Sequence, residues 1–128
     1  MTSGPRLFSV LKQGSTLIAS VHTALDDSQL ERFREDLVER IGRERARGVI
    51  IDVAALDVLD SFATRMLRDT AEMARLRGAR TVIVGIQPDV AFAMVQLGLT
   101  LEGTETALDL EDALSRLKIR VGRERSAQ

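Results

Sequence analysis

Two short apolar runs constrain this chain more than any other feature. They cover residues 48–53 and 81–85 and are rich in valine and isoleucine. Continuous runs of this kind are typical of strands that are covered on both faces of a parallel sheet. Between them, residues 60–77 repeat apolar side chains at helical spacing, and Gly78 follows as a stop signal. A strand, a helix and a second strand predict a right-handed parallel crossover, and therefore an α/β fold.

The segment before this crossover predicts a hairpin and one further helix. Residues 7–11 and 15–21 have the pattern of two strands, separated by a turn at Gln13-Gly14. Ser28 and Glu31 have the spacing of a capping box, and apolar residues then recur every three or four positions until about residue 47. The N-terminal part of the sheet is therefore expected to be antiparallel, which makes the whole sheet mixed.

The segment after the crossover predicts two more helices, so that about four helices flank the sheet. Pro88 is placed to open the third helix, and Gly98 to end it. A weak extended piece at 100–101 precedes a last helix over residues 110–117. We expect one domain over residues 1–117, followed by a basic and flexible tail over residues 118–128.

Composition excludes several classes of function. The 128 residues include no cysteine and a single histidine, His22, so thiolate metal sites, disulfides and most acid–base machinery are unexpected. A net charge of −1 and 3% aromatic residues argue against a nucleic-acid surface. No apolar run approaches the roughly 18 residues of a membrane span. We expect a cytoplasmic protein with no catalytic residues, no cofactor and no metal.

The junction between the first apolar run and the helix carries the candidate site. Asp57, Asp60 and Ser61 lie where a parallel strand ends and a helix begins, which is where such sheets usually hold functional groups. Asp60 or Ser61 would be the helix N-cap, and Ser61 is either part of this cap or a phosphate acceptor beside the positive end of the helix dipole. A phosphate there would also meet repulsion from the two carboxylates. Both interpretations remain open at this point.

Several blocks of the sequence carry a family resemblance. They are residues 50–53, 59–62, 78–80, 84–88, 90–91, 97–98 and 105–110. Together they resemble the STAS domain of anti-sigma-factor antagonists, and within it the RsbS type of stressosome scaffold protein. The resemblance runs from about Leu7 to Leu117, and the Asp-Ser and Gly-Ile-Gln-Pro blocks carry most of it. It implies a STAS-like mixed sheet.

The resemblance also implies a function and a set of partners. Ser61 matches the serine that an RsbT-like serine kinase phosphorylates, and Asp57, Asp60 and Phe62 would shape the surface that the kinase reads. The unmodified chain would assemble with itself, as a dimer, and with RsbR-like STAS paralogues into a large particle that sequesters the kinase. Phosphorylation would release the kinase, and an RsbX-like phosphatase would restore the scaffold. The chain would be a non-enzymatic regulator of the stress response.

The resemblance leaves one alternative within the family. A simple anti-sigma-factor antagonist would bind one kinase directly and form no large particle. Two departures favour the scaffold over an RsbR-like sensor. The STAS pattern begins within ten residues of Met1, with no room for a sensory domain, and Ala93 stands where related proteins often carry a threonine. A second phosphorylation site at that position is therefore doubtful.

Three interpretations from other functional classes have less support in the sequence. Asp52 ends a strand as the phosphoaccepting aspartate of a receiver domain does, but the acidic pair and the lysine of that family are absent, so a strand-end cap is favoured. A hydrolase using Ser61 and His22 lacks the Gly-x-Ser-x-Gly motif. A nucleotide-binding domain lacks both glycine-rich phosphate motifs, and Gly85 begins a plain turn between a strand and a helix.

Overall fold

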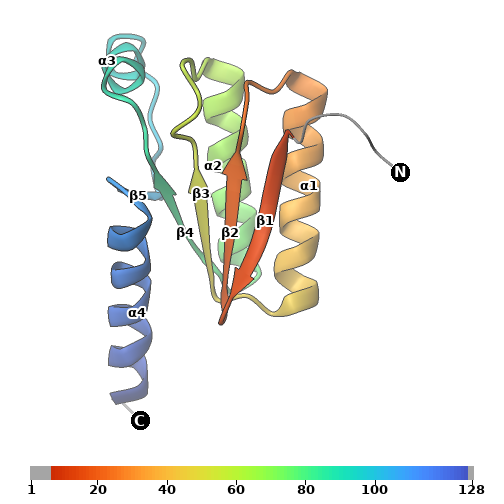
Figure 1. Ribbon diagram of the computed structural model, residues 1–128, viewed down its shortest axis with the longest axis vertical. Helices are drawn as coiled ribbons and strands as arrows, with labels where there is room; N and C mark the ends of the chain where they lie inside the picture. The colour runs from red at the N-terminus through yellow and green to blue at the C-terminus, as the bar shows by residue number, and fades with distance from the viewer. Residues whose placement is uncertain (1–6, 127–128) are drawn as a thin grey trace.

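The computed structural model describes residues 7–126, with side chains described up to residue 118. One five-stranded sheet runs through the molecule in the order β1-β2-β3-β4-β5 (Figure 1). β1 pairs antiparallel with β2, and the other three pairings are parallel. The predicted mixed sheet is confirmed. The strands are β1 (Phe8–Gln13), β2 (Thr16–Val21), β3 (Gly48–Asp52), β4 (Arg80–Val84) and β5 (Glu105–Ala107).

Helices cover the two faces of the sheet unequally. α1 and α2 lie side by side against one face, and α4 lies on the other face beside β3, β4 and β5 (Figure 1). None of the helices in the described part of the chain is long and apolar enough to span a membrane. The helices are α1 (Asp27–Glu44), α2 (Ser61–Leu76), α3 (Pro88–Gln96) and α4 (Leu110–Ser126).

The continuous apolar run of β3 fills two cores at once. Because successive side chains of a strand point to opposite faces, Val49 and Ile51 enter the main core under α1 and α2, whereas Ile50 enters a smaller core under α4. All three side chains are fully buried. A strand covered on both faces has no position for a polar side chain, which explains why this run reads as unbroken valine and isoleucine. The smaller core comprises Ile18, Ile50, Val82, Val84, Ala113 and Leu117.

The N-terminal hairpin forms as predicted, with its turn one residue later. Gln13 pairs with Thr16, so the two-residue loop is Gly14-Ser15 rather than Gln13-Gly14. Gly14 has φ +63°, which suits a glycine at the first loop position of a tight hairpin turn. The position of the turn is therefore set by Gly14, the residue that tolerates a positive φ.

The start of α1 corrects one prediction. The capping box is formed by Asp26 and Gln29, not by Ser28 and Glu31: Asp26 Oδ1 accepts the Gln29 N–H at 2.8 Å, and Gln29 Oε1 accepts the Asp26 N–H at 2.9 Å. Ser28 lies inside the helix and donates its hydroxyl proton to the same Asp26 oxygen at 3.0 Å. Aspartate and serine are both good N-caps, and the reciprocal bond to Gln29 decides between them.

The C-terminal part corrects two element boundaries. The fifth strand lies at Glu105–Ala107, not at residues 100–101, because only the later segment reaches the free edge of β4. α4 continues to Ser126 instead of ending near Leu117, and the lysine, arginine and glutamate residues beyond that point favour a helix. That the domain ends at residue 117 and that residues 118–128 are flexible stays a prediction, since most side chains of that segment lie outside the described part.

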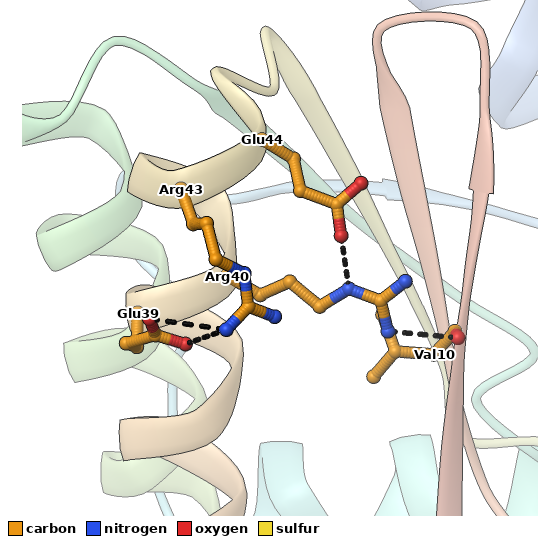
Figure 2. Close-up of polar contacts among 5 residues, drawn as sticks. All are labelled: Val10, Glu39, Arg40, Arg43 and Glu44. Atoms are coloured by element: carbon orange, nitrogen blue, oxygen red, sulfur yellow. Dashed lines mark hydrogen bonds and ion pairs between the residues drawn. The ribbon is translucent and has the colours of Figure 1, made fainter.

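Arg40 ties α1 to the edge strand β1 (Figure 2). Its Nη1 donates a hydrogen bond to the Val10 carbonyl oxygen at 3.1 Å, and its Nε donates to the Glu44 carboxylate. The latter bond holds the pKa of Glu44 below its ordinary value. Arg43 pairs with Glu39 at 3.0 Å on the same helix. Arg40 therefore bridges two elements, whereas the Arg43 pair stays within α1.

We expect Arg40→Met to lower the free energy of unfolding by about 1 kcal/mol, because the charged hydrogen bond to Val10 is lost. Arg43→Met is the matched control, and its exposed pair should contribute less than about 0.5 kcal/mol. Urea unfolding of the two variants measures the difference. Equal losses would mean that the contact with Val10 does not stabilise the hairpin.

Candidate functional site

Two loops meet at the carboxyl ends of β3 and β4, next to the start of α2. The first is the β3–α2 loop, residues 53–60, and the second is the β4–α3 loop, residues 85–87. Asp52 Oδ1 accepts the Ala54 N–H at 2.9 Å, which confirms the predicted strand-end cap. The Gln87 Nε2 group donates to the Ala54 carbonyl oxygen at 2.8 Å. Side-chain bonds from both strand ends therefore fix the beginning of the β3–α2 loop.

Gly85 lets the two loops approach each other closely. It has φ +82°, and a Cβ atom at this position would lie 2.8 Å from the Cβ of Ala54 and 3.1 Å from its backbone nitrogen. In real proteins a Cβ atom essentially never lies as close as 2.8 Å to another heavy atom of this kind. A glycine is therefore required here for two reasons, the backbone conformation and the contact.

The rest of the β3–α2 loop is anchored to the main core. Leu56 and Leu59 are buried, and they border an apolar cavity of about 110 Å³ that reaches Asp60. Val58 lies between them in sequence and is 68% exposed. The loop therefore alternates buried anchors with exposed side chains, which gives the exposed residues a fixed backbone.

Ser61 is the first residue of α2, and it is exposed. Asp60 is the N-cap: its Oδ1 accepts the Ala63 N–H at 2.8 Å, and its carbonyl oxygen accepts the Thr64 N–H at 2.9 Å. The prediction that Asp60 or Ser61 is the helix N-cap is confirmed, and Asp60 is the residue that fills this role. The helix therefore does not depend on the Ser61 hydroxyl.

The three residues expected to form a partner surface differ in their surroundings. Asp57 is exposed, and one of its oxygens accepts a hydrogen bond of 3.4 Å from Gln87 Nε2. Asp60 is exposed as well, but one carboxylate oxygen is committed to the cap. Phe62 is half-buried and packs against the main core. The structure thus brings Asp57, Asp60 and Ser61 together on one exposed edge, while Phe62 lies partly beneath it.

Sequence reasoning missed two residues of this region. No role is predicted for Val58 from the sequence, because Leu59 lies between the same two aspartates, Asp57 and Asp60, and is buried. Gln87 belongs to the Gly-Ile-Gln-Pro block but was given no role, and only the structure reveals its bonds to Ala54 and Asp57. Both residues extend the candidate site beyond the helix start.

The described residues do not bring Ser61 and His22 into contact, as the hydrolase interpretation would require. In the described part of the chain, His22 Nε2 bonds the Ser9 hydroxyl at 3.0 Å and makes no hydrogen bond to Ser61. No group of three or more His, Asp or Glu side chains among the described residues could hold a metal ion. The arrangement at Ser61 instead offers an exposed hydroxyl, a helix N-terminus and two adjacent carboxylates.

Comparison with solved structures places the chain beside stressosome proteins. A variant of RsbS from Moorella thermoacetica has 35% sequence identity and a TM-score of 0.77, and the match covers 89% of this chain and 97% of that one. A chain from a study of the molecular architecture of the stressosome has 32% identity and a TM-score of 0.71, over 88% and 98% of the two chains. SpoIIAA, an anti-sigma-factor antagonist with 16% identity and a TM-score of 0.67, shares the fold.

Comparison with curated sequences gives the same family. RsbRA of Bacillus subtilis, a RsbT co-antagonist protein, is 29% identical over 98 residues, which cover 69% of this chain and 36% of RsbRA. RsbRC of the same organism is 28% identical, and the match covers 34% of its length. The chain thus spans about a third of these two relatives. The STAS domain model matches residues 8–113. This chain therefore belongs to the STAS domain family.

Proposed function

We propose that this chain is a non-enzymatic scaffold of a stressosome partner-switching system in the cytoplasm, and that it sequesters a serine kinase until Ser61 is phosphorylated. The observation that carries the proposal is the exposed hydroxyl of Ser61 at the start of α2, in a chain that is 35% identical to RsbS over nearly its whole length. The proposed partners are an RsbT-like kinase, RsbR-like STAS paralogues and an RsbX-like phosphatase.

The burial of neighbouring hydroxyl groups supports Ser61 as the acceptor. Thr64 lies one turn further along α2, but only 2% of its surface is exposed, so a kinase could not reach it without unfolding the helix. Ser28 is exposed in the first turn of α1, where its hydroxyl is bonded to Asp26. Ser61 combines exposure with a position next to the two loops that meet at the sheet edge.

The electrostatics of the site indicate that phosphorylation would change the charge of the surface and leave the fold intact. The helix N-terminus favours a phosphate on Ser61 by about 0.3–1 kcal/mol, because unpaired backbone N–H groups point toward it. Asp57 and Asp60 oppose the added charge of about −1.5 to −2. These effects are of similar size and opposite sign, so phosphorylation would leave α2 folded while it makes the exposed edge strongly negative.

Intact-mass spectrometry after incubation with an RsbT-like kinase and Mg-ATP tests the acceptor. We expect one added phosphate on the unmodified chain and none on Ser61→Ala, because the other nearby hydroxyl of α2 is buried. Ser28→Ala is the control and should accept phosphate normally. Phosphate mapped to Thr64 or Ser28 would contradict the assignment.

Gel filtration tests the scaffold role separately. Mixed with an RsbR-type partner, the chain should elute in a very large species. A complex of only a few chains would instead favour a simple anti-sigma-factor antagonist that binds its kinase directly.

A further inference from the structure

Residues 90–101 contain no charged side chain, although 29% of the whole chain is charged. This stretch comprises α3 from its third residue onward and the beginning of the loop that follows it. Figure 1 shows α3 beyond the end of β4, on the side of the molecule away from α1. A helix that is apolar on all sides is normally buried on all sides, so the surroundings of α3 are informative.

The rest of the chain covers only one side of α3. Val90 and Met94 are its two buried residues. At about 100° per residue, Phe92 and Val95 point to the opposite side, and they are 65% and 78% exposed. Leu97 ends the helix and is 70% exposed. Phe92, Val95 and Leu97 are called the α3 patch below.

The composition of this surface is that of an interface centre. The exposed side of α1 carries ion pairs, such as Arg43 with Glu39, whereas α3 has one charged residue, Asp89 in its first turn. All four phenylalanines lie in the described part of the chain, and Phe92 alone is exposed. Interface centres are poor in charged residues and rich in aromatic ones, as α3 is on its exposed side.

The area of the α3 patch fits a symmetric dimer. If a large apolar side chain offers about 150–200 Å², the exposed fractions of its three residues leave roughly 350 Å². A standard interface buries about 800 Å² per partner, of which about 65% is apolar in homodimers. The patch supplies most of that apolar share, and the exposed side chains of Ala91 and Ala93 adjoin it.

We propose that the α3 patch binds the same patch of a second copy of this chain, with the two helices related by a twofold axis. A surface without charge meets its own copy without like-charge repulsion. The inference rests on the proposed scaffold role, and it names the surface through which two copies meet.

Two observations favour a second copy over the kinase as the occupant. The kinase has to dissociate when Ser61 is phosphorylated, whereas a contact made by uncharged side chains is hardly altered by an added phosphate. The α3 patch also contains none of the residues of the exposed edge at Ser61. Gln87, which bonds Asp57 of that edge, precedes α3, and Val95 lies about 12 Å further along the helix axis. The dimer and the kinase therefore use different surfaces.

Sedimentation equilibrium of the purified full-length chain tests the contact. We expect the mass of a dimer, and the same dissociation constant at about 50 mM and about 500 mM salt, because screening affects charged contacts and not apolar ones. A monomer at every concentration, or a dimer that dissociates at the higher salt concentration, would overturn the proposal.

A pair of matched variants locates the surface. Phe92→Glu/Val95→Glu should raise the dissociation constant of the dimer about 100-fold or more. Glutamate favours a helix at least as well as phenylalanine or valine, so α3 should stay folded, which circular dichroism verifies. Leu11→Glu/Leu76→Glu is the control, because these leucines are 64% and 73% exposed outside the patch. Association that survives in the folded α3 variant, or that the control loses equally, contradicts the assignment.

Cross-linking tests the twofold symmetry. The chain contains no cysteine, so a single introduced cysteine reports on one position. Gln96→Cys, beside Phe92 on the exposed side of α3, should give covalent dimers with a short bis-maleimide, and Leu76→Cys should give few. Equal yields at the two positions, or no product from Gln96→Cys, would rule out a symmetric contact at α3.

Phosphorylation separates this contact from the proposed switch. The variant Phe92→Glu/Val95→Glu should still accept phosphate on Ser61, and Ser61→Asp should still form the dimer. A dimer without phosphorylation would refute the switch alone, and phosphorylation without a dimer would refute the contact alone. If the unmodified chain is a monomer and needs Phe92 and Val95 to bind the kinase or an RsbR-like paralogue, that partner covers the patch and the second copy does not.

Discussion

Ser61→Ala is expected to hold the serine kinase in the complex, whereas Ser61→Asp is expected to release it in part. The physical reason is the charge added to an exposed edge that already carries Asp57 and Asp60. A phosphoserine adds about −1.5 to −2 charges, and an aspartate adds about −1. If phosphorylation weakens kinase binding about 100-fold, which corresponds to about 2.7 kcal/mol, Ser61→Asp should weaken it about tenfold.

Calorimetric titration of an RsbT-like kinase into each variant measures these affinities, before and after treatment with Mg-ATP. Ser28 provides a matched control, because it too is an exposed serine in the first turn of a helix beside an N-cap aspartate. Ser28→Asp should bind the kinase as the unmodified chain does. If Ser28→Asp and Ser61→Asp weaken binding equally, the effect is one of overall charge and Ser61 is not the switch.

Gly85→Ala should destabilise the protein by about 2–5 kcal/mol. A positive φ costs an alanine roughly 1–2 kcal/mol, and overpacking against Ala54 adds about 1–3 kcal/mol. Gly98→Ala is the control: Gly98 has φ +70°, but a Cβ atom there would meet no atom within 4 Å. Gly98→Ala should lower the free energy of unfolding only by the cost of the positive φ, about 1–2 kcal/mol.

Urea unfolding measures the free energy of unfolding of the two glycine variants. The difference between their losses gives the cost of the contact between the two loops. Ala54→Gly in the Gly85→Ala background should recover part of the loss, because it removes the Cβ atom 2.8 Å away but leaves the Ala54 backbone at 3.1 Å. Similar losses for Gly85→Ala and Gly98→Ala would show that the loops yield without cost. The Ser61 site would then be less rigidly supported than its contacts indicate.

Local sequence patterns were sufficient to predict an element where only one pattern fitted the segment. β3 and β4 are continuous apolar runs, the pattern that a strand covered on both faces requires. The start of α2 was equally clear, because Asp60 is a strong N-cap in front of a helical repeat. These elements place Ser61 at the carboxyl edge of a parallel sheet without any knowledge of the tertiary structure.

Local sequence patterns did not predict an element correctly where two capping patterns were equivalent or where a strand was too short to show a pattern. Asp26 with Gln29 and Ser28 with Glu31 offer the same capping spacing, and the observed bonds select the first pair. β5 is only Glu105–Ala107, too short for a periodic pattern, and its pairing with β4 defines it. Such choices depend on contacts with distant residues, which propensity does not contain.

The sequence by itself determined the α/β class, the parallel crossover and the position of Ser61 at a helix start, because hydrophobic period and capping act over a few neighbouring residues. Only the tertiary structure decided what surrounds that serine: the contact of Gly85 with Ala54, the burial of Thr64 and the bond from Gln87 to Asp57. These contacts join segments far apart in the chain, and the packing of parallel strands and helices is what brings them together.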